Sequence, residues 1–128
     1  MTDTSFKPVL YLKKNCPFCI MASIFLLEAG LADTVEVREF TPGDDQEAAI
    51  RKELGAQLEK VSFPSLQLSP GVYMNESEAV IARLAERAGI DPKGLPLLQS
   101  YKEMLDNMIR VVREGMEYKK QAELAATA

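Results

Sequence analysis

Two cysteines, Cys16 and Cys19, are the only thiols in the 128-residue sequence, and they stand three positions apart. A cysteine attacks disulfides as its thiolate, and a second thiol close by can displace the first from a mixed disulfide. In a reducing compartment a C-x-x-C pair indicates redox or metal chemistry more than a structural bridge. The redox interpretation predicts Cys16 as the nucleophile and Cys19 as the resolving thiol.

The elements around this pair must hold Cys16 at the start of a helix. Residues 9–12 form a short apolar run typical of a buried strand, and Pro17 fits the first turn of a helix, where its missing N–H costs nothing. The helix is expected over 17–29, with Gly30 ending it. The strand-to-helix junction therefore falls at the first cysteine.

A helix start favours the thiolate form of Cys16. Free backbone N–H groups and the positive end of the macrodipole lie there, and Lys13 and Lys14 just before the pair add positive charge. An unperturbed thiol has a pKa of about 8.5, and lowering it by about 1.5 units makes half of the thiol reactive at neutral pH. Cys19, one turn into the helix, is expected to be more buried and less reactive.

Two other interpretations of the cysteines stay open at this point. Both thiols could be inert core residues, which the charged surroundings of Cys16 disfavour. They could also form half of a metal site shared between two chains, which Pro17 and the lack of histidine disfavour. The redox pair is the interpretation that these residues favour.

The composition excludes several kinds of chemistry. The sequence has no histidine, which removes Ser-His-Asp and Cys-His catalysis and His-ligated metals. Two cysteines cannot close a structural zinc site by themselves, so no metal cofactor is expected. With 15 Lys+Arg against 19 Asp+Glu the net charge is −4, which is a poor match to nucleic acid.

Neither a membrane span nor a signal peptide is apparent. No stretch reaches the roughly 18 unbroken apolar residues that a span needs, and residues 1–5 do not begin a basic region followed by an apolar core. We therefore expect no membrane contact and a cytoplasmic location.

The rest of the chain completes an α/β pattern. Asn75, followed three residues later by Glu78, resembles a helix capping box. The order β-α-β-α-β-β-α implies a mixed four-stranded sheet. Downstream of the first helix, the expected elements are a strand over 35–40, a helix over 46–58, a hairpin of strands over 64–68 and 72–74, and a helix that ends near 88.

Residues 91–128 are expected to form a helical extension of the domain that spans 6–90. After a connector rich in proline and glycine, a long helix is expected over 97–120. We expect its apolar stripe to pack on the same domain, with the methionines as adaptable core residues, and the seam of a homodimer is the alternative. The stripe and the nearby methionine are Leu98, Tyr101, Leu105, Met108, Val112 and Met116, with Met104 beside them.

The segment over residues 11–19 resembles the active site of dithiol glutaredoxins. Their pattern is an aromatic strand end, a lysine three residues before the first cysteine, and then C-P-Y-C, and the lysine here is Lys13. Phe18 replaces the tyrosine of that pattern and can still offer glutathione an apolar wall. The likeness extends over residues 8–88 and implies the thioredoxin-like (glutaredoxin) fold.

Two further segments resemble glutathione-binding positions. Phe63-Pro64 stands where glutaredoxins have Val-Pro, which implies a cis Pro64 and a Phe63 backbone that pairs with the cysteinyl part of glutathione. Glu76-Ser77 looks like the Glu-Ser pair of glutathione transferase N-terminal domains. That likeness implies that Ser77 and the helix start receive the γ-glutamyl carboxylate, that Glu76 meets the ammonium, and that Lys13 meets the glycyl carboxylate. Simple helix capping is the alternative role of Glu76 and Ser77.

These features predict a glutathione-dependent thiol–disulfide oxidoreductase that reduces protein or small-molecule disulfides, or glutathione mixed disulfides, through Cys16. Glutathione is the expected co-substrate. A truncated glutathione transferase-like protein is one alternative, and a non-catalytic glutathione-binding or redox-sensing module is another. An iron–sulfur cluster shared by two Cys16 thiolates is disfavoured by Pro17.

Overall fold

The computed structural model describes residues 6–126, which contain a four-stranded sheet in the order β2-β1-β3-β4. β1 and β2 are parallel, and the other neighbouring pairs are antiparallel. This arrangement confirms the predicted α/β, thioredoxin-like fold with an added C-terminal helix. The elements are β1 (Val9–Lys13), α1 (Pro17–Glu28), η1 (Ala32–Thr34), β2 (Glu36–Phe40), α2 (Asp45–Gly55), β3 (Ser65–Ser69), β4 (Val72–Asn75), α3 (Ser77–Ala88), η2 (Pro92–Gly94) and α4 (Pro96–Ala126).

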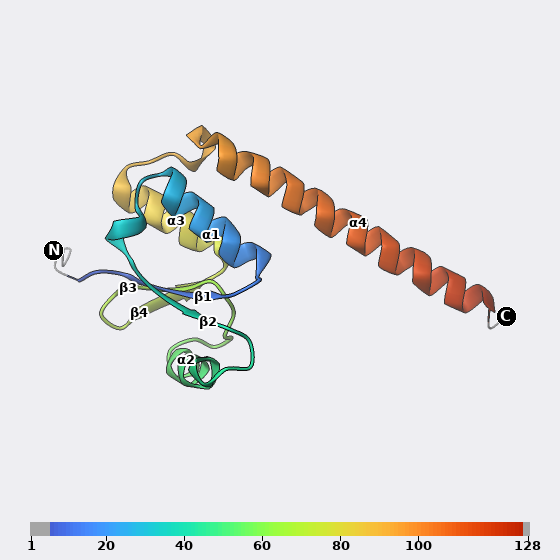
Figure 1. Cartoon of the computed structure of the whole chain (residues 1–128), viewed down its shortest axis with the longest axis horizontal. Coiled ribbons are helices and arrows are strands. Elements are labelled where there is room, and N and C mark those ends of the chain that lie inside the picture. The colour runs from blue at the N-terminus through green and yellow to red at the C-terminus, as the bar shows by residue number, and fades with distance from the viewer. Residues whose placement is uncertain (1–5, 127–128) are drawn as a thin grey trace.

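Helices cover both faces of the sheet. Figure 1 shows α1 and α3 on one face and α2 on the other. Side chains alternate along β1, so Leu10 and Leu12 pack among α1 and α3, while Tyr11 packs with Ile50 and Leu54 of α2. All five of these side chains are buried. Helices therefore pack on both faces of the sheet. This packing holds the strands in place, and with them the segments that leave their ends.

Strand register brings three segments of the chain to one end of the sheet. Ser65, the first residue of β3, pairs with Tyr11 of β1 on one side and with Asn75 of β4 on the other. The residues that follow β1, precede β3 and follow β4 therefore leave the sheet at the same end. These segments carry the two cysteines, Phe63-Pro64 and Glu76-Ser77.

The capping box predicted at Asn75 is wrong. Asn75 is the last residue of β4, and its side-chain amide donates a hydrogen bond to the carbonyl of Lys60 at 2.6 Å. Helix α3 begins only at Ser77, and its N-cap position is occupied by Glu76, which makes no side-chain capping bond. The strand pairing of Asn75 with Ser65 outweighs the local preference of asparagine for a cap.

Helix α4 packs on the domain only over its first turns. Leu98 and Leu105 are buried, whereas Met108, Val112 and Met116 are 51%, 59% and 68% exposed. The structure therefore corrects the expectation of a stripe packed along its length, and the methionines, Met104 included, are exposed rather than core residues.

The unequal lengths of two helices explain this exposure. Helix α4 has 31 residues and α1, against which it packs, has 12, so at about 1.5 Å per residue α4 is much the longer. Figure 1 shows the C-terminal part of α4 projecting past the rest of the domain. Among the described residues, no side chain beyond Ile109 of α4 is buried or half-buried.

One carboxylate at the end of α1 caps α4. The Glu28 side chain accepts hydrogen bonds from the backbone N–H groups of Leu97 and Leu98, at 2.9 and 2.8 Å. These donors belong to the first turn of α4, where an α-helix leaves its N–H groups unpaired. Glu28 thus fixes where α4 starts on the domain.

Removing this cap is expected to destabilise the protein. Glu28→Ala should lower the free energy of unfolding by about 1–2 kcal/mol, because two backbone donors lose their acceptor. Glu28→Gln keeps an acceptor oxygen and is the matched control, with an expected loss of less than about half of that. Urea unfolding monitored by circular dichroism measures both values, and equal losses in the two variants would contradict the capping role.

Candidate thiol site

Cys16 occupies the N-cap position of α1. Its backbone is extended, with φ −104° and ψ 119°, and Pro17 follows as the first helical residue. The backbone carbonyl of Cys16 accepts the N–H of Ile20 at 2.9 Å, while its thiol makes no capping hydrogen bond. Because the side chain is half-buried, the sulfur stands at the helix start with partial access to solvent. The predicted placement of the first cysteine is confirmed.

Cys19 lies one turn further along α1 and is buried, with 3% of its surface exposed. The backbone N–H of Lys13 donates to its sulfur at 3.4 Å. Burial raises the pKa of Cys19 to about 12, with the neighbouring Cys16 thiol acting in the same direction and the Lys13 N–H acting against it. At neutral pH this thiol therefore stays protonated. Both cysteines are free.

The raised pKa of Cys19 predicts a loss of stability at alkaline pH. In the unfolded chain the thiol ionises near its ordinary pKa of 9.0, whereas in the folded chain it does so only at about 12. The unfolded state releases its proton first, so this contribution is intact below about pH 9 and is lost as pH rises toward about pH 12. Cys19→Ser does not titrate there, so between pH 8 and pH 10.5 its free energy of unfolding should fall by about 1–2 kcal/mol less than that of the wild type. Urea titrations at both pH values test this, and identical falls would contradict a buried neutral thiol.

The loop before β3 carries a cis proline at the end of the sheet where the thiol motif lies. The Phe63–Pro64 peptide bond is cis, as the resemblance implies, and Pro64 is fully buried. The hydroxyl of Ser65 donates to the carbonyl of Ser62 at 2.5 Å and closes the loop on itself. The Phe63 ring packs against the core that also contacts Cys16. These contacts hold the backbone of Phe63 at the same end of the sheet as the cysteines.

Glu76 and Ser77 form the start of α3 at that end. Glu76 is exposed and has φ 76° and ψ 118°, a conformation that non-glycine residues rarely adopt. Ser77 is half-buried and is the first residue of the helix. No side chain caps α3, so the helix start has the free donors and the positive dipole end that an anion requires. This geometry argues against a simple capping role of the Glu76 side chain.

The geometry agrees with a comparison against protein families. The family model of the glutathione S-transferase N-terminal domain matches residues 10–93. The chain belongs to this family. The match does not test the likeness to dithiol glutaredoxins. That likeness stays a prediction about the segment over residues 11–19.

Solved structures of glutathione transferases are among those similar to part of this chain. A glutathione S-transferase from the Antarctic clam Laternula elliptica is 21% identical, with a TM-score of 0.48 over 64% of this chain and 35% of that one. Glutathione transferase Omega 2C from Trametes versicolor is 22% identical, with a TM-score of 0.47 over 72% of this chain and 39% of that one. This chain thus spans well under half of either structure. No curated protein matches the sequence.

A contact missed by the sequence reasoning ties α4 to the thiol motif of this transferase-type domain. The hydroxyl of Tyr101 donates to the carbonyl of Pro17 at 2.6 Å. Burial raises the pKa of Tyr101, and the nearby thiols of Cys16 and Cys19 act in the same direction. The position of Tyr101 in the apolar stripe signals packing, but nothing in the pattern signals this hydrogen bond across 84 positions.

Helix α4 also lines an open apolar cavity beside the thiol motif. The cavity holds about 520 Å³ and is almost entirely apolar. It lies where α4 passes the first turn of α1, since Pro17 is the only α1 residue among those that line it. The α4 residues that line it are Leu105, Met108, Ile109, Val112, Arg113 and Met116.

The remaining predicted site residues lie at the same end of the domain. Lys13 is the last residue of β1 and reaches Cys19 through its backbone N–H. Phe18 is 41% exposed in the first turn of α1.

Among residues 6–126 no group of three or more His, Cys, Asp or Glu side chains could hold a metal ion. Over the same residues no helix has the length and apolar character to cross a membrane.

Proposed function

We propose that this protein is a glutathione-dependent thiol–disulfide oxidoreductase with Cys16 as the nucleophile. The observation that carries the proposal is the contrast between the two thiols of one motif. Cys16 is partly accessible at the start of α1, whereas Cys19 is buried one turn later with its pKa raised to about 12. Membership of the glutathione S-transferase N-terminal domain family supports glutathione as the co-substrate.

In this proposal the end of the sheet binds glutathione in an extended form. The backbone of Phe63 pairs with the cysteinyl unit, and the start of α3 at Ser77 receives the γ-glutamyl carboxylate. Glu76 faces the γ-glutamyl ammonium, Lys13 faces the glycyl carboxylate, and Phe18 offers an apolar wall. The strand register supports this set, because the segments that carry Lys13, Phe63 and Glu76-Ser77 meet the sheet at the end where α1 begins.

The reaction proceeds by two thiol–disulfide exchanges. The Cys16 thiolate attacks the glutathionyl sulfur of a mixed disulfide, a new S–S bond forms, and the substrate thiolate leaves and takes up a proton. A second glutathione thiolate then attacks the Cys16–glutathione disulfide, which releases oxidised glutathione and restores the Cys16 thiolate. One substrate disulfide is reduced, and two glutathionyl units end as one disulfide.

A second candidate is conjugation of glutathione to an apolar electrophile. The observation that favours it is the cavity of about 520 Å³ between Pro17 and the exposed part of α4. In that reaction the thiolate of glutathione itself attacks the electrophile, and the leaving group departs with the bonding electrons. Cys16 is then a neighbour of the reacting sulfur rather than the nucleophile.

Two substrates measured side by side separate these candidates. The first assay follows reduction of a glutathionylated peptide at fixed glutathione, and the second follows conjugation of 1-chloro-2,4-dinitrobenzene. We expect the first rate to exceed the uncatalysed rate by a far larger factor than the second. The reverse ratio would favour conjugation, and no acceleration of either reaction would leave glutathione binding without catalysis.

Self-association through α4 is also part of the proposal. Apolar side chains such as Val111, Val112 and Met116 are more than half exposed on one helix, a pattern that marks interaction surfaces. Sedimentation velocity should therefore detect a homodimer that Val112→Glu disrupts, and a wild-type monomer at all concentrations would contradict it.

The need for reduced glutathione fits the cytoplasmic location expected from the sequence.

A further inference from the structure

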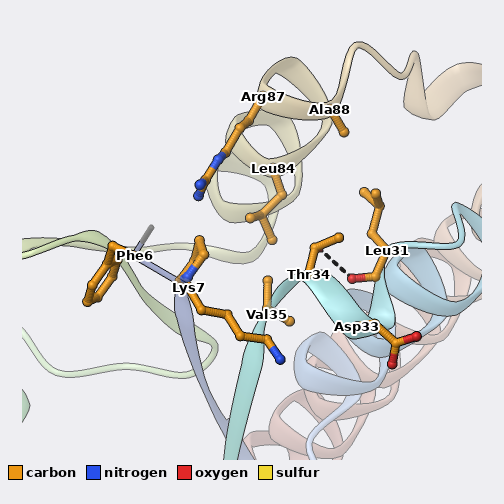
Figure 2. Close-up of a pocket in the computed structure, with 10 residues that line it drawn as sticks. Phe6, Lys7, Leu31, Asp33, Thr34, Val35, Leu84, Arg87 and Ala88 are labelled. Atoms are coloured by element: carbon orange, nitrogen blue, oxygen red, sulfur yellow. Dashed lines mark hydrogen bonds between the residues drawn. The ribbon is translucent and has the colours of Figure 1, made fainter. Parts of the chain in front are cut away.

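A second cavity lies at the end of the sheet opposite to the thiol motif. It holds about 380 Å³ and is lined where β1 and β2 begin, just after α1, and along the last turns of α3. Cys16 follows the carboxyl end of β1, so the body of the sheet separates the two places. Figure 2 shows side chains from all of these segments around the space. None of the residues proposed above to bind glutathione contributes to it.

The floor of this cavity is apolar. Val35 and Leu84 are 4% and 5% exposed, and both belong to the main core. Leu31 and Phe6 are half-buried and extend the apolar lining toward solvent. The volume lies within the range of small-molecule sites, which combine an apolar surface with fixed polar groups. The cavity can therefore take an apolar group of modest size.

Two cations border this floor. Lys7 and Arg87 are both exposed at the cavity, and neither forms an ion pair or a side-chain hydrogen bond with any residue from 6 to 126. In Figure 2 the Arg87 side chain extends from α3 toward Phe6 and Lys7, and the Lys7 side chain runs past Val35. In a chain of net charge −4, this is a local excess of positive charge.

The position of Arg87 follows from the fold, but no anionic partner for it lies among the described residues. Arg87 is in the last turn of α3, where the negative end of the helix dipole stabilises a cation. The carbonyls of Glu86 and Ala85 already accept the N–H groups of Gly89 and Ile90, so the guanidinium keeps its donors for another acceptor. A carboxylate is the group that best matches a guanidinium fork.

We propose that this cavity binds a small organic anion, with a carboxylate attached to an aromatic or short aliphatic body. The apolar body lies on Val35 and Leu84, and the carboxylate pairs with the Arg87 guanidinium while Lys7 adds positive charge to the same cavity. Asp33 also lines the cavity and repels further negative charge, which favours a monoanion over a polyphosphate.

Binding of 1-naphthoate to the full chain tests the proposal, with titration followed by calorimetry. Lys7→Gln and Arg87→Gln should each weaken binding about threefold to fivefold, the size expected of one partly exposed ion pair. Asp33→Asn should strengthen binding, because it removes the one repulsive charge. Lys120→Gln, an exposed lysine on α4, is the matched control and should leave the affinity unchanged.

Three further measurements locate the ligand. Ala88→Trp, which adds bulk at an exposed lining position, should abolish binding without altering any charge. The neutral analogue 1-naphthalenemethanol should bind at least about fivefold more weakly than 1-naphthoate, since it lacks the ion pairs. Saturating glutathione should not compete. Equal affinity for the neutral analogue, no response to the three charge variants, or displacement by glutathione would each overturn the proposal.

Discussion

Cys16→Ser is expected to lower the rate of reduction of a glutathionylated peptide at least about a thousandfold, because a serine hydroxyl is neither ionised at neutral pH nor nucleophilic toward sulfur. Cys19→Ser should keep the rate within about threefold of the wild type. The contrast follows from the two environments. Cys16 is partly accessible at the helix start, and Cys19 is buried behind it.

The raised pKa of Cys19 leads to an expectation about which thiol resolves the proposed mixed disulfide. Because burial raises the pKa of Cys19 far above neutral, its thiol stays protonated at pH 7, and glutathione in solution should resolve the Cys16 mixed disulfide faster. Initial rates for the wild type and the two variants, at several glutathione concentrations, give the comparison. Loss of activity in Cys19→Ser equal to that in Cys16→Ser would show that both thiols are needed. Full activity in Cys16→Ser would end the assignment.

Glu76→Gly is expected to raise stability and to lower affinity for glutathione. Glu76 holds φ 76° and ψ 118°, and a non-glycine residue in such a region costs about 1–3 kcal/mol. Glycine adopts positive φ freely, so the free energy of unfolding should rise by about 1 kcal/mol, after the larger entropy of an unfolded glycine is counted. The variant also removes the carboxylate proposed to face the γ-glutamyl ammonium, which should weaken binding by at least about tenfold.

Glu78→Gly is the matched control two residues further on. Glu78 lies in the first turn of α3 and pairs with Lys102 at 3.4 Å, so glycine there should lower the free energy of unfolding by about 1 kcal/mol and leave glutathione affinity unchanged. Urea unfolding and calorimetric titration with glutathione measure both effects. A Glu76→Gly protein that binds glutathione as the wild type does would remove Glu76 from the proposed site.

Local patterns in the sequence were sufficient to predict the order of the elements. The alternation of 35–40 and the apolar run at 9–12 predict strands, and Pro17 marks a helix start, because each depends on neighbouring residues alone. The placement of Cys16 and the burial of Cys19 follow from that junction. The cis bond before Pro64 came from family resemblance, since no local rule specifies it.

Features that depend on distant partners could not be predicted in this way. The cap that Glu28 provides to α4 joins residues 69 and 70 positions apart, and periodicity carries no information about such a pair. The stripe of α4 correctly indicated an apolar face, but whether a partner reaches that face depends on the length of α1. The misplaced cap at Asn75 has the same origin, because the pairing of β4 with β3 decides it.

The attachment of α4 has a mechanical consequence. Glu28, the last residue of α1, accepts hydrogen bonds from the first turn of α4. Tyr101 of α4 donates a hydrogen bond to Pro17, the first residue of α1. The remaining turns of α4 project from the domain, as Figure 1 shows. The contact nearer to the projecting turns is the one from Tyr101 to Pro17, the residue that follows Cys16. We therefore expect a force on the projecting part of α4 to reach the backbone beside Cys16 first.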